Sequence, residues 1–225
     1  MPQPPPTDSP GDLRQWRLPR GRHGLPRELV ERSQRERLLA AVVRVTVERG
    51  YASTTVADIL GEAGVGRESF YELFDDKLDC MLAAHKILLD NLEEQVRAGY
   101  AEDGPWPQRV RKSLSVTLDW FAADPDAARF TLVELSTTGP AFRSIFQAGF
   151  ARFIALVDEG FDEDGPSPDL ERATSLAVGA TMARIYEEVV LDRIAELPQL
   201  LSDLTYGFLV PFLGEEQARA VAASG

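Results

Sequence analysis

The chain has 225 residues, a single cysteine and a formal net charge of −12 at pH 7. That length accommodates one large domain or two small ones, and 44% hydrophobic residues can supply a core. The lone thiol of Cys80 excludes an intramolecular disulfide and a multi-cysteine metal cluster. No apolar run approaches the ~18 residues of a membrane helix, and no signal-peptide pattern is present, so we expect a cytoplasmic protein without membrane association.

Charge is distributed unevenly along the chain. From Arg14 to Arg49 there are ten arginines against four glutamates, whereas from Cys80 onward there are 12 basic and 23 acidic residues. The acidic surplus therefore lies away from the N-terminal part, and a local basic stripe allows even an acidic protein to bind nucleic acid. Residues 1–27 are rich in proline and arginine, and we expect them to form a flexible arm.

The stretch from Gly50 to Lys77 predicts two short helices joined by a tight corner. Its first glycine follows a long apolar-periodic run and is placed to end a preceding helix in the left-handed conformation. Thr54 or Thr55 offers a hydroxyl N-cap for the next helix. The sequence Gly64-Val65-Gly66 suits the corner, and Arg67 opens the following helix.

This arrangement is typical of a helix-turn-helix unit, whose second helix lies in the major groove with its first residues at base edges. Arginine, glutamate and serine can read such edges, while tyrosine and lysine beside them can contact phosphates. The predicted DNA contacts are Arg20, Arg22, Thr54, Thr55, Arg67, Glu68, Ser69, Tyr71 and Lys77. The corner alone is also found in all-α proteins that never meet DNA.

The pattern G-Y-x-x-T-T-V-x-D-I-x-x-x-A-G-V-x-x-x-S-F-Y-x-x-F-x-x-K resembles the N-terminal domain of the TetR family of transcriptional repressors, from about Arg32 to Met81 without a gap. The resemblance implies a homodimer, with a small DNA-binding domain and a larger helical domain that holds a small-molecule effector and the dimer interface. Two positions depart from the family pattern. Leu73 replaces a residue that is often polar and contacts phosphate, and Glu68 replaces one that is often small.

The arginine-rich arm, which includes Arg20 and Arg22, has two interpretations. Arms ahead of a helix-turn-helix can enter the adjacent minor groove, where arginine reads groove width and A·T content. The same charge also fits a solvated tail that is attracted to phosphates without specificity. The sequence leaves both interpretations open.

The rest of the chain is predicted to be helical, with no strand alternation. The whole is then an all-α fold of about nine helices, with an arm at residues 1–27, a helix-turn-helix domain at 28–80, and an effector-binding and dimerisation domain at 81–225. After the first three helices, further ones are expected at about residues 76–99, 107–123, 124–136, from 140, 169–196 and 198–213, with a loop at 161–168.

The last two predicted helices carry complementary apolar stripes, small on one and larger on the other, which favours close antiparallel packing. Apolar surface left on such a pair would form a four-helix bundle with a twofold mate, the usual dimer interface in the family that the chain resembles. The predicted interface residues are Leu176, Ala180, Ala183, Val190, Leu197, Leu201, Leu204 and Phe208. The alternative is that both stripes are used in the core of one subunit.

An effector pocket is expected between these helices and the preceding ones. Its predicted lining is Trp120, Phe121, Phe130, Glu134, Phe146, Phe150, Met182 and Tyr186. As a set, these side chains indicate a largely apolar ligand, although any single aromatic at helical spacing is more often a core residue.

These features favour a ligand-responsive repressor that binds a palindromic double-stranded DNA operator as a homodimer and is released by its effector. A helical adaptor that binds protein is the alternative, but it would need neither the basic arm nor Arg67 and Lys77. An enzyme is not expected, because His23 and His85 lack catalytic partners and no metal, nucleophile or phosphate-loop motif is present. We expect no cofactor and no metal.

Overall fold

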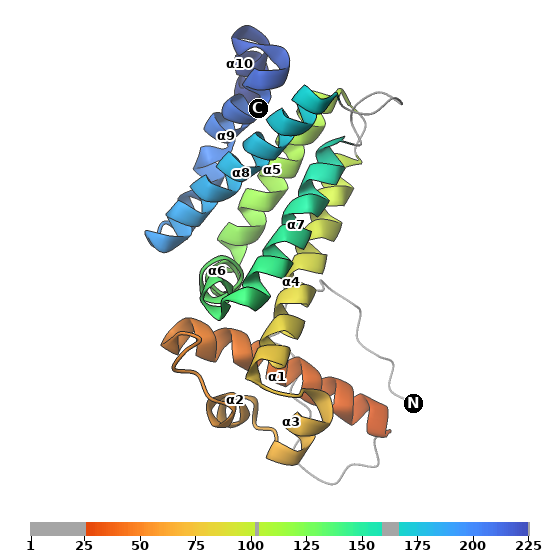
Figure 1. Ribbon diagram of the computed structural model, residues 1–225, viewed down its shortest axis with the longest axis vertical. Coiled ribbons are helices and arrows are strands. Elements are labelled where there is room, and N and C mark those ends of the chain that lie inside the picture. Colours follow the sequence, from red (N-terminus) through yellow and green to blue (C-terminus); the bar gives the residue numbers. More distant parts are fainter. Residues whose placement is uncertain (1–25, 102–103, 159–166, 225) are drawn as a thin grey trace, which may run out of the picture. The chain divides into compact units, whose positions relative to one another are not determined.

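Glycines and capping side chains set the helix boundaries in the computed structural model, which describes residues 26–101, 104–158 and 167–224. Within these ranges the chain is all-α, as predicted, with ten α-helices and no strand (Figure 1). The α-helices are α1 (Arg27–Arg49), α2 (Val56–Ala63), α3 (Arg67–Leu73), α4 (Lys77–Tyr100), α5 (Trp106–Ala123), α6 (Pro125–Arg129), α7 (Pro140–Asp158), α8 (Pro168–Val190), α9 (Leu201–Leu213) and α10 (Glu215–Ala223). None of the helices in these ranges combines the length and apolar character needed to cross a bilayer.

The chain divides into two compact units after Asn91, inside α4. The sequence predicted a domain boundary after residue 80. The later division accords with the burial of Cys80, Met81, Ala84 and His85 in the first half of α4.

The first unit is built on α1, which packs against both α2 and α3. Gly50 ends α1 with φ 79° and ψ 151°, so its φ is positive as expected but its ψ is not that of the left-handed helix. Gly64 does adopt the left-handed conformation, with φ 61° and ψ 39°, and its N–H donates to the Leu60 carbonyl at 2.9 Å. Val65 then points into the core and is only 7% exposed, so the corner has the predicted design.

The second unit is a helical body arranged around α5, which contacts α6, α9, α10 and the 3-10 segment Ile194–Leu200. Helix α8 packs against α7 on one side and α9 on the other. Phe121, Phe130 and Ile185 are almost completely buried and form part of this core. Burial of such large apolar side chains is the main favourable term that holds helices of this kind together.

Three helix predictions for this unit differ from the structure. The helix expected at 124–136 is α6 followed by a π turn (Phe130–Glu134) and a 3-10 turn (Leu135–Thr138). The helix expected to reach residue 196 ends at Val190, before Asp192 with φ 61°. Helix α10 was not predicted, because its buried residues are the small Ala218 and Ala222, which give a weak apolar pattern.

Candidate nucleic-acid interface and cavity of the helical body

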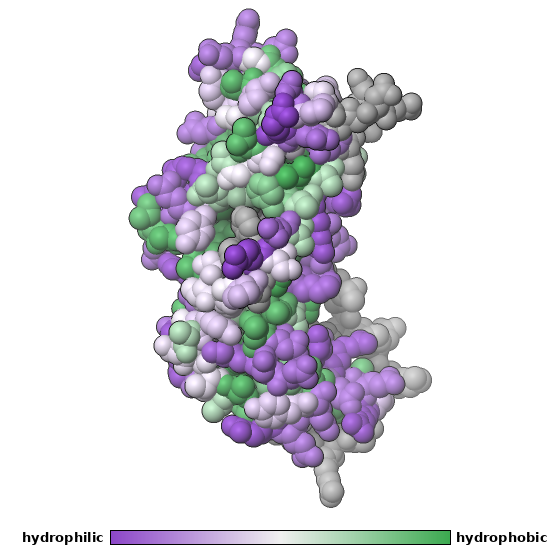
Figure 2. Space-filling model, viewed as in Figure 1, coloured by the Kyte–Doolittle hydropathy of each residue, from purple (hydrophilic) through white to green (hydrophobic). Residues whose placement is uncertain are grey.

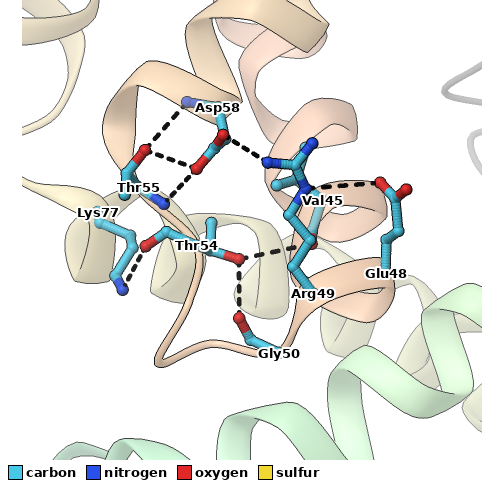
Figure 3. Close-up of polar contacts among 8 residues, drawn as sticks. All are labelled: Val45, Glu48, Arg49, Gly50, Thr54, Thr55, Asp58 and Lys77. Carbon is cyan, nitrogen blue, oxygen red and sulfur yellow. Dashed lines mark hydrogen bonds and ion pairs between the residues drawn. The ribbon is translucent and has the colours of Figure 1, made fainter.

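The turn before α2 is held by a closed set of hydrogen bonds (Figure 3). Thr55 is the N-cap: its hydroxyl accepts from the Asp58 N–H at 3.2 Å, and Asp58 Oδ2 accepts from the Thr55 N–H at 2.9 Å. Hydrogen bonds from Thr55 hold the pKa of Asp58 below its ordinary value. Thr54, by contrast, is 2% exposed and its hydroxyl donates to the Gly50 carbonyl at 2.9 Å. The predicted DNA contact by Thr54 is therefore wrong, because its side chain is used inside the domain.

Lys77 ties the start of α4 to the same turn. Its Nζ donates to the backbone carbonyls of Tyr51 at 2.6 Å and Thr54 at 2.7 Å, and it lies 4.0 Å from the centroid of the Tyr51 ring. Partial burial lowers the pKa of Lys77. Two of its three donors are thus used within the domain, which leaves at most one for the predicted phosphate contact.

Helix α3 has an anchored face and an exposed face. Phe70 and Phe74 are buried, with ring centroids 5.7 Å apart, and they hold the helix against the core. Arg67, Glu68 and Tyr71 are exposed. A base-reading helix presents exposed side chains at its first turn, and arginine and glutamate are among those that can contact base edges.

Ser69 differs from its exposed neighbours on α3. It is half-buried, and its hydroxyl accepts from Nε2 of Gln34 on α1 at 3.4 Å. Its side chain therefore lies against α1, and its hydroxyl keeps one proton to donate. The two arm residues of the prediction, Arg20 and Arg22, lie outside the described residues.

Three arginines of α1 are bonded to groups of α2 and its C-terminal end. Arg49 pairs with Asp58 at 2.6 Å and Arg44 pairs with Glu62 at 2.9 Å, so two acidic side chains of α2 are compensated (Figure 3 shows the first pair). Arg37 donates to the carbonyls at the end of α2, those of Ala63 and Gly64, at 3.2 and 3.3 Å. The charge of α1 thus offsets the negative charge of α2, which the sequence had not indicated.

The second unit contains a cavity with a volume of about 60 Å³, which is partly open to solvent. Its lining comes from α4, α5, α7, α8 and α9: Val96, Tyr100, Val110, Ser113, Leu114, Thr117, Phe153, Leu156, Val157, Val178, Thr181, Met182 and Phe208.

Polar atoms of the cavity wall are few and mostly bonded within the wall. Ser113 Oγ donates to the Arg109 carbonyl at 3.0 Å, and Thr117 Oγ1 donates to the Ser113 carbonyl at 2.8 Å. The Tyr100 hydroxyl donates to the Val157 carbonyl at 3.4 Å. The wall is therefore largely apolar.

Of the seven predicted lining residues whose side chains are described, one lies in the wall of this cavity, Met182. Phe121 and Phe130 are 1% and 0% exposed and fill the core, while Tyr186 is 41% exposed on the surface of α8. Trp120 packs edge-on against Phe121. Glu134 lies in the π turn, and Phe150 lies on α7 and reaches Gly179 of α8, so neither of these lines the cavity. The side chain of Phe146 lies outside the description.

Sequence reasoning missed the hydroxyl-bearing residues of the cavity. Ser113 and Thr117 lie one turn apart on the apolar face of α5, and Thr181 lies beside Met182 on α8. These residues could have been found from the sequence as small hydroxyl side chains that interrupt an apolar stripe.

The predicted dimer residues divide into two groups. On α8, Leu176, Ala180, Ala183 and Val190 are exposed along one helix face, with Leu176 75% and Val190 50% exposed. We call these four residues the α8 stripe. Figure 2 shows apolar colouring over the part of the body where α7 and α8 run.

The other group belongs to the subunit interior. Leu197 is 0% exposed and Phe208 is 4% exposed, and Phe208 lines the cavity, so both are corrections to the predicted interface. Leu201 and Leu204 are half-buried.

Comparison with known proteins supports the interpretation of the first unit. Residues 38–84 match the family model described as bacterial regulatory proteins, tetR family. The matched segment covers most of α1, all of α2 and α3, and the beginning of α4.

Solved structures with the same fold extend the similarity to most of the chain. The fatty acid degradation regulator FadR from Bacillus halodurans is 19% identical with a TM-score of 0.68, covering 80% of this chain and 95% of its own. FadR from Bacillus subtilis, solved with stearoyl-CoA, is 19% identical with a TM-score of 0.67, covering 79% and 97%. TylP from Streptomyces fradiae, described as a TetR regulator, is 20% identical with a TM-score of 0.59, covering 83% and 88%. The helix-turn-helix segment at residues 38–84 therefore matches the tetR family model, and the chain shares the fold of solved TetR-family regulators.

Proposed function

We propose that the protein is a ligand-responsive transcriptional repressor that binds a palindromic operator as a homodimer. The observation that carries the proposal is the division of α3. Phe70 and Phe74 anchor the helix in the core, while Arg67, Glu68 and Tyr71 face outward at the position of a recognition helix. Arg67 can donate two hydrogen bonds to a guanine, and Glu68 can accept from a cytosine amine.

A homodimer supplies the second recognition helix that a palindromic site needs. The α8 stripe is the surface that we assign to the dimer contact, because exposed leucine and valine on one helix face are costly to leave in water. Two α3 helices could then enter successive major grooves, which lie ~34 Å apart on one side of the duplex.

The cavity of the helical body is the proposed effector site, and α4 is the element that links it to the DNA-binding unit. Val96 and Tyr100, near the end of α4, line the cavity, while the same helix begins at Lys77 in the first unit. A ligand that binds one position of α4 better than another would shift the population of DNA-binding dimers. The stearoyl-CoA bound to the Bacillus subtilis relative carries a long apolar chain, in keeping with an apolar effector here.

A mobility-shift assay with the DNA upstream of the protein's own gene tests the proposal. We expect a discrete shift at low salt that is lost steeply as salt rises, because arginine–phosphate contacts release counterions. A scrambled duplex of the same length is the control and should be bound more weakly. Absence of any shift at low salt would contradict the proposal and favour a protein-binding adaptor.

A further inference from the structure

The wall of the effector cavity contains no side chain that is ionised at neutral pH among the residues described as lining it. Every lining side chain is aliphatic, aromatic, a thioether or a hydroxyl. A charged group placed against such a wall would lose its hydration without gaining a counterion. The part of a ligand that enters the cavity must therefore be uncharged.

The three aliphatic hydroxyls of the wall differ in whether their proton is still available for a hydrogen bond to a ligand. Ser113 and Thr117 both spend their hydroxyl proton on a carbonyl of α5. Thr181 on α8 is 7% exposed and lines the cavity, and within the described ranges its hydroxyl makes no hydrogen bond. The hydroxyl of Thr181 therefore faces the space of the cavity, where its proton is available to an acceptor on a ligand in place of water.

We propose that the cavity selects an uncharged ligand with an apolar body and one oxygen acceptor, a hydroxyl or a carbonyl, which is bound by the hydroxyl of Thr181. A ligand hydroxyl has a further option, since it can also donate to the oxygen of Ser113 or Thr117. The apolar body fills the space bounded by Leu114, Phe153 and Phe208. The identity of this site as the effector site rests on the proposed function, whereas the class of ligand rests on the cavity alone.

Isothermal titration of the full-length protein at pH 7 with four eight-carbon probes tests the ligand class. The probes are 1-octanol, 2-octanone, octanoate and octylammonium, which share an apolar chain and differ in the head group. We expect both neutral probes to bind at least tenfold more tightly than either ion. Equal or tighter binding of an ion, or no saturable binding of any probe, would overturn the inference.

Substitutions at Thr181 test the residue. Thr181→Val keeps the shape and removes the hydroxyl, so the affinity for octanol and octanone should fall about 5- to 10-fold, the usual effect of losing one neutral hydrogen bond. Thr181→Ser keeps the hydroxyl and should restore most of the affinity. Thr205→Val is the matched control, because Thr205 is also a buried threonine without a hydrogen bond but does not line the cavity.

Wild-type affinity in Thr181→Val, with circular dichroism showing a folded protein, would refute the role of Thr181. The effector role is judged separately by adding 1-octanol to the mobility-shift assay. If octanol binds and Thr181→Val weakens it, but operator binding does not respond, the ligand class stands and the effector role fails.

Discussion

Arg67 and Lys77 are both cations of the helix-turn-helix unit, but their surroundings indicate different roles. Arg67 is exposed at the first turn of α3, and among the described residues it has neither a hydrogen bond nor an ion pair. Lys77 is half-buried and holds the turn that carries Tyr51 and Thr54. A base-reading role suits the first residue, and a mainly structural role suits the second.

Arg67→Ala and Lys77→Ala should therefore weaken DNA binding in distinguishable ways. Loss of a bidentate guanine contact costs about 1–3 kcal/mol at one operator position, so Arg67→Ala should bring operator affinity close to that for scrambled DNA, with an unchanged melting temperature. Lys77→Ala should lower the melting temperature and weaken binding to both duplexes alike. Mobility shifts on the two duplexes, with thermal unfolding alongside, measure both effects.

Two results would contradict this division of roles between Arg67 and Lys77. If Arg67→Ala loses the same affinity on operator and scrambled DNA, it contacts phosphate rather than a base. If Lys77→Ala melts like the wild type, the bonds to the two carbonyls do not stabilise the turn.

His85 makes the stability of the protein depend on pH. It is 3% exposed in α4, and burial lowers its pKa to about 4, from an ordinary value of about 6.5. The unfolded chain therefore binds a proton between pH 6.5 and 4 that the folded chain refuses. The contribution of His85 to the free energy of unfolding is fully present above pH 6.5. It is lost as the pH falls to 4, which lowers the free energy of unfolding by on the order of 3 kcal/mol.

Urea unfolding at pH 7 and at pH 4.5 measures this decline. A His85→Leu variant, which cannot take up the proton, should lose less stability than the wild type over the same interval. An equal loss in the two proteins would assign the pH dependence to other groups, such as carboxylates.

At the scale of helices, the sequence was informative wherever a specific residue imposes a backbone conformation. Gly64, Pro125 and Pro140 mark boundaries that the structure confirms to within a residue or two. The sequence predicted that either Thr54 or Thr55 caps α2, because both residues can supply a hydroxyl. Packing decides between them: Thr54 is buried, and Thr55 is the N-cap. The early end of α8 was missed because the residues after Val190 keep an apolar pattern.

The cavity of the helical body could not be predicted from the same signals, and the reason is physical. A cavity is space that side chains do not fill, so large aromatics at helical spacing, such as Phe121 and Phe130, mark the filled core. The cavity wall depends on how five helices meet, which periodicity within one helix does not contain. Thr181, the polar residue to which we assign ligand binding, is a threonine that no sequence pattern distinguishes from the others.

The C-terminal end of α8 depends on a buried carboxylate. Glu188 is 2% exposed and accepts from Arg193 Nε at 2.5 Å and Nη2 at 3.0 Å, and it also pairs with Arg184 one turn earlier. The hydrogen bonds from Arg193 hold the pKa of Glu188 below its ordinary value. This cluster fixes the direction in which the chain leaves α8.

Glu188→Gln should lower the melting temperature of the second unit, because two guanidinium groups then lose their anionic partner. Glu187→Gln is the control, since Glu187 is exposed and pairs only with Arg184 at the surface, where ion pairs contribute little. Thermal unfolding followed by circular dichroism compares them. Equal melting temperatures for the two variants would show that the buried cluster does not stabilise the corner.

For the whole molecule, the net charge of −12 gives no general attraction to DNA. Two acidic residues of α2 are paired with arginines of α1, and this pairing leaves the net charge of the helix-turn-helix unit unchanged. The pairing also occupies arginines that were expected, from the composition of the chain, to contact DNA phosphates. Under the proposed function, strong operator binding then depends on placing two recognition helices together in the proposed dimer.

Leu176→Glu should convert the dimer to a monomer, because it places a charge in the middle of the proposed contact at the most exposed apolar residue of the α8 stripe. Sedimentation velocity measures the change of mass. Operator affinity should fall at least tenfold, since each monomer then binds a half-site without the high effective concentration that its mate provides. Ile87→Glu is the control, as Ile87 is 40% exposed on α4 and lies outside the stripe. A Leu176→Glu protein that sediments as a dimer would place the interface elsewhere. A monomer with undiminished operator affinity would instead mean that one recognition helix, and not a pair on a palindrome, accounts for binding.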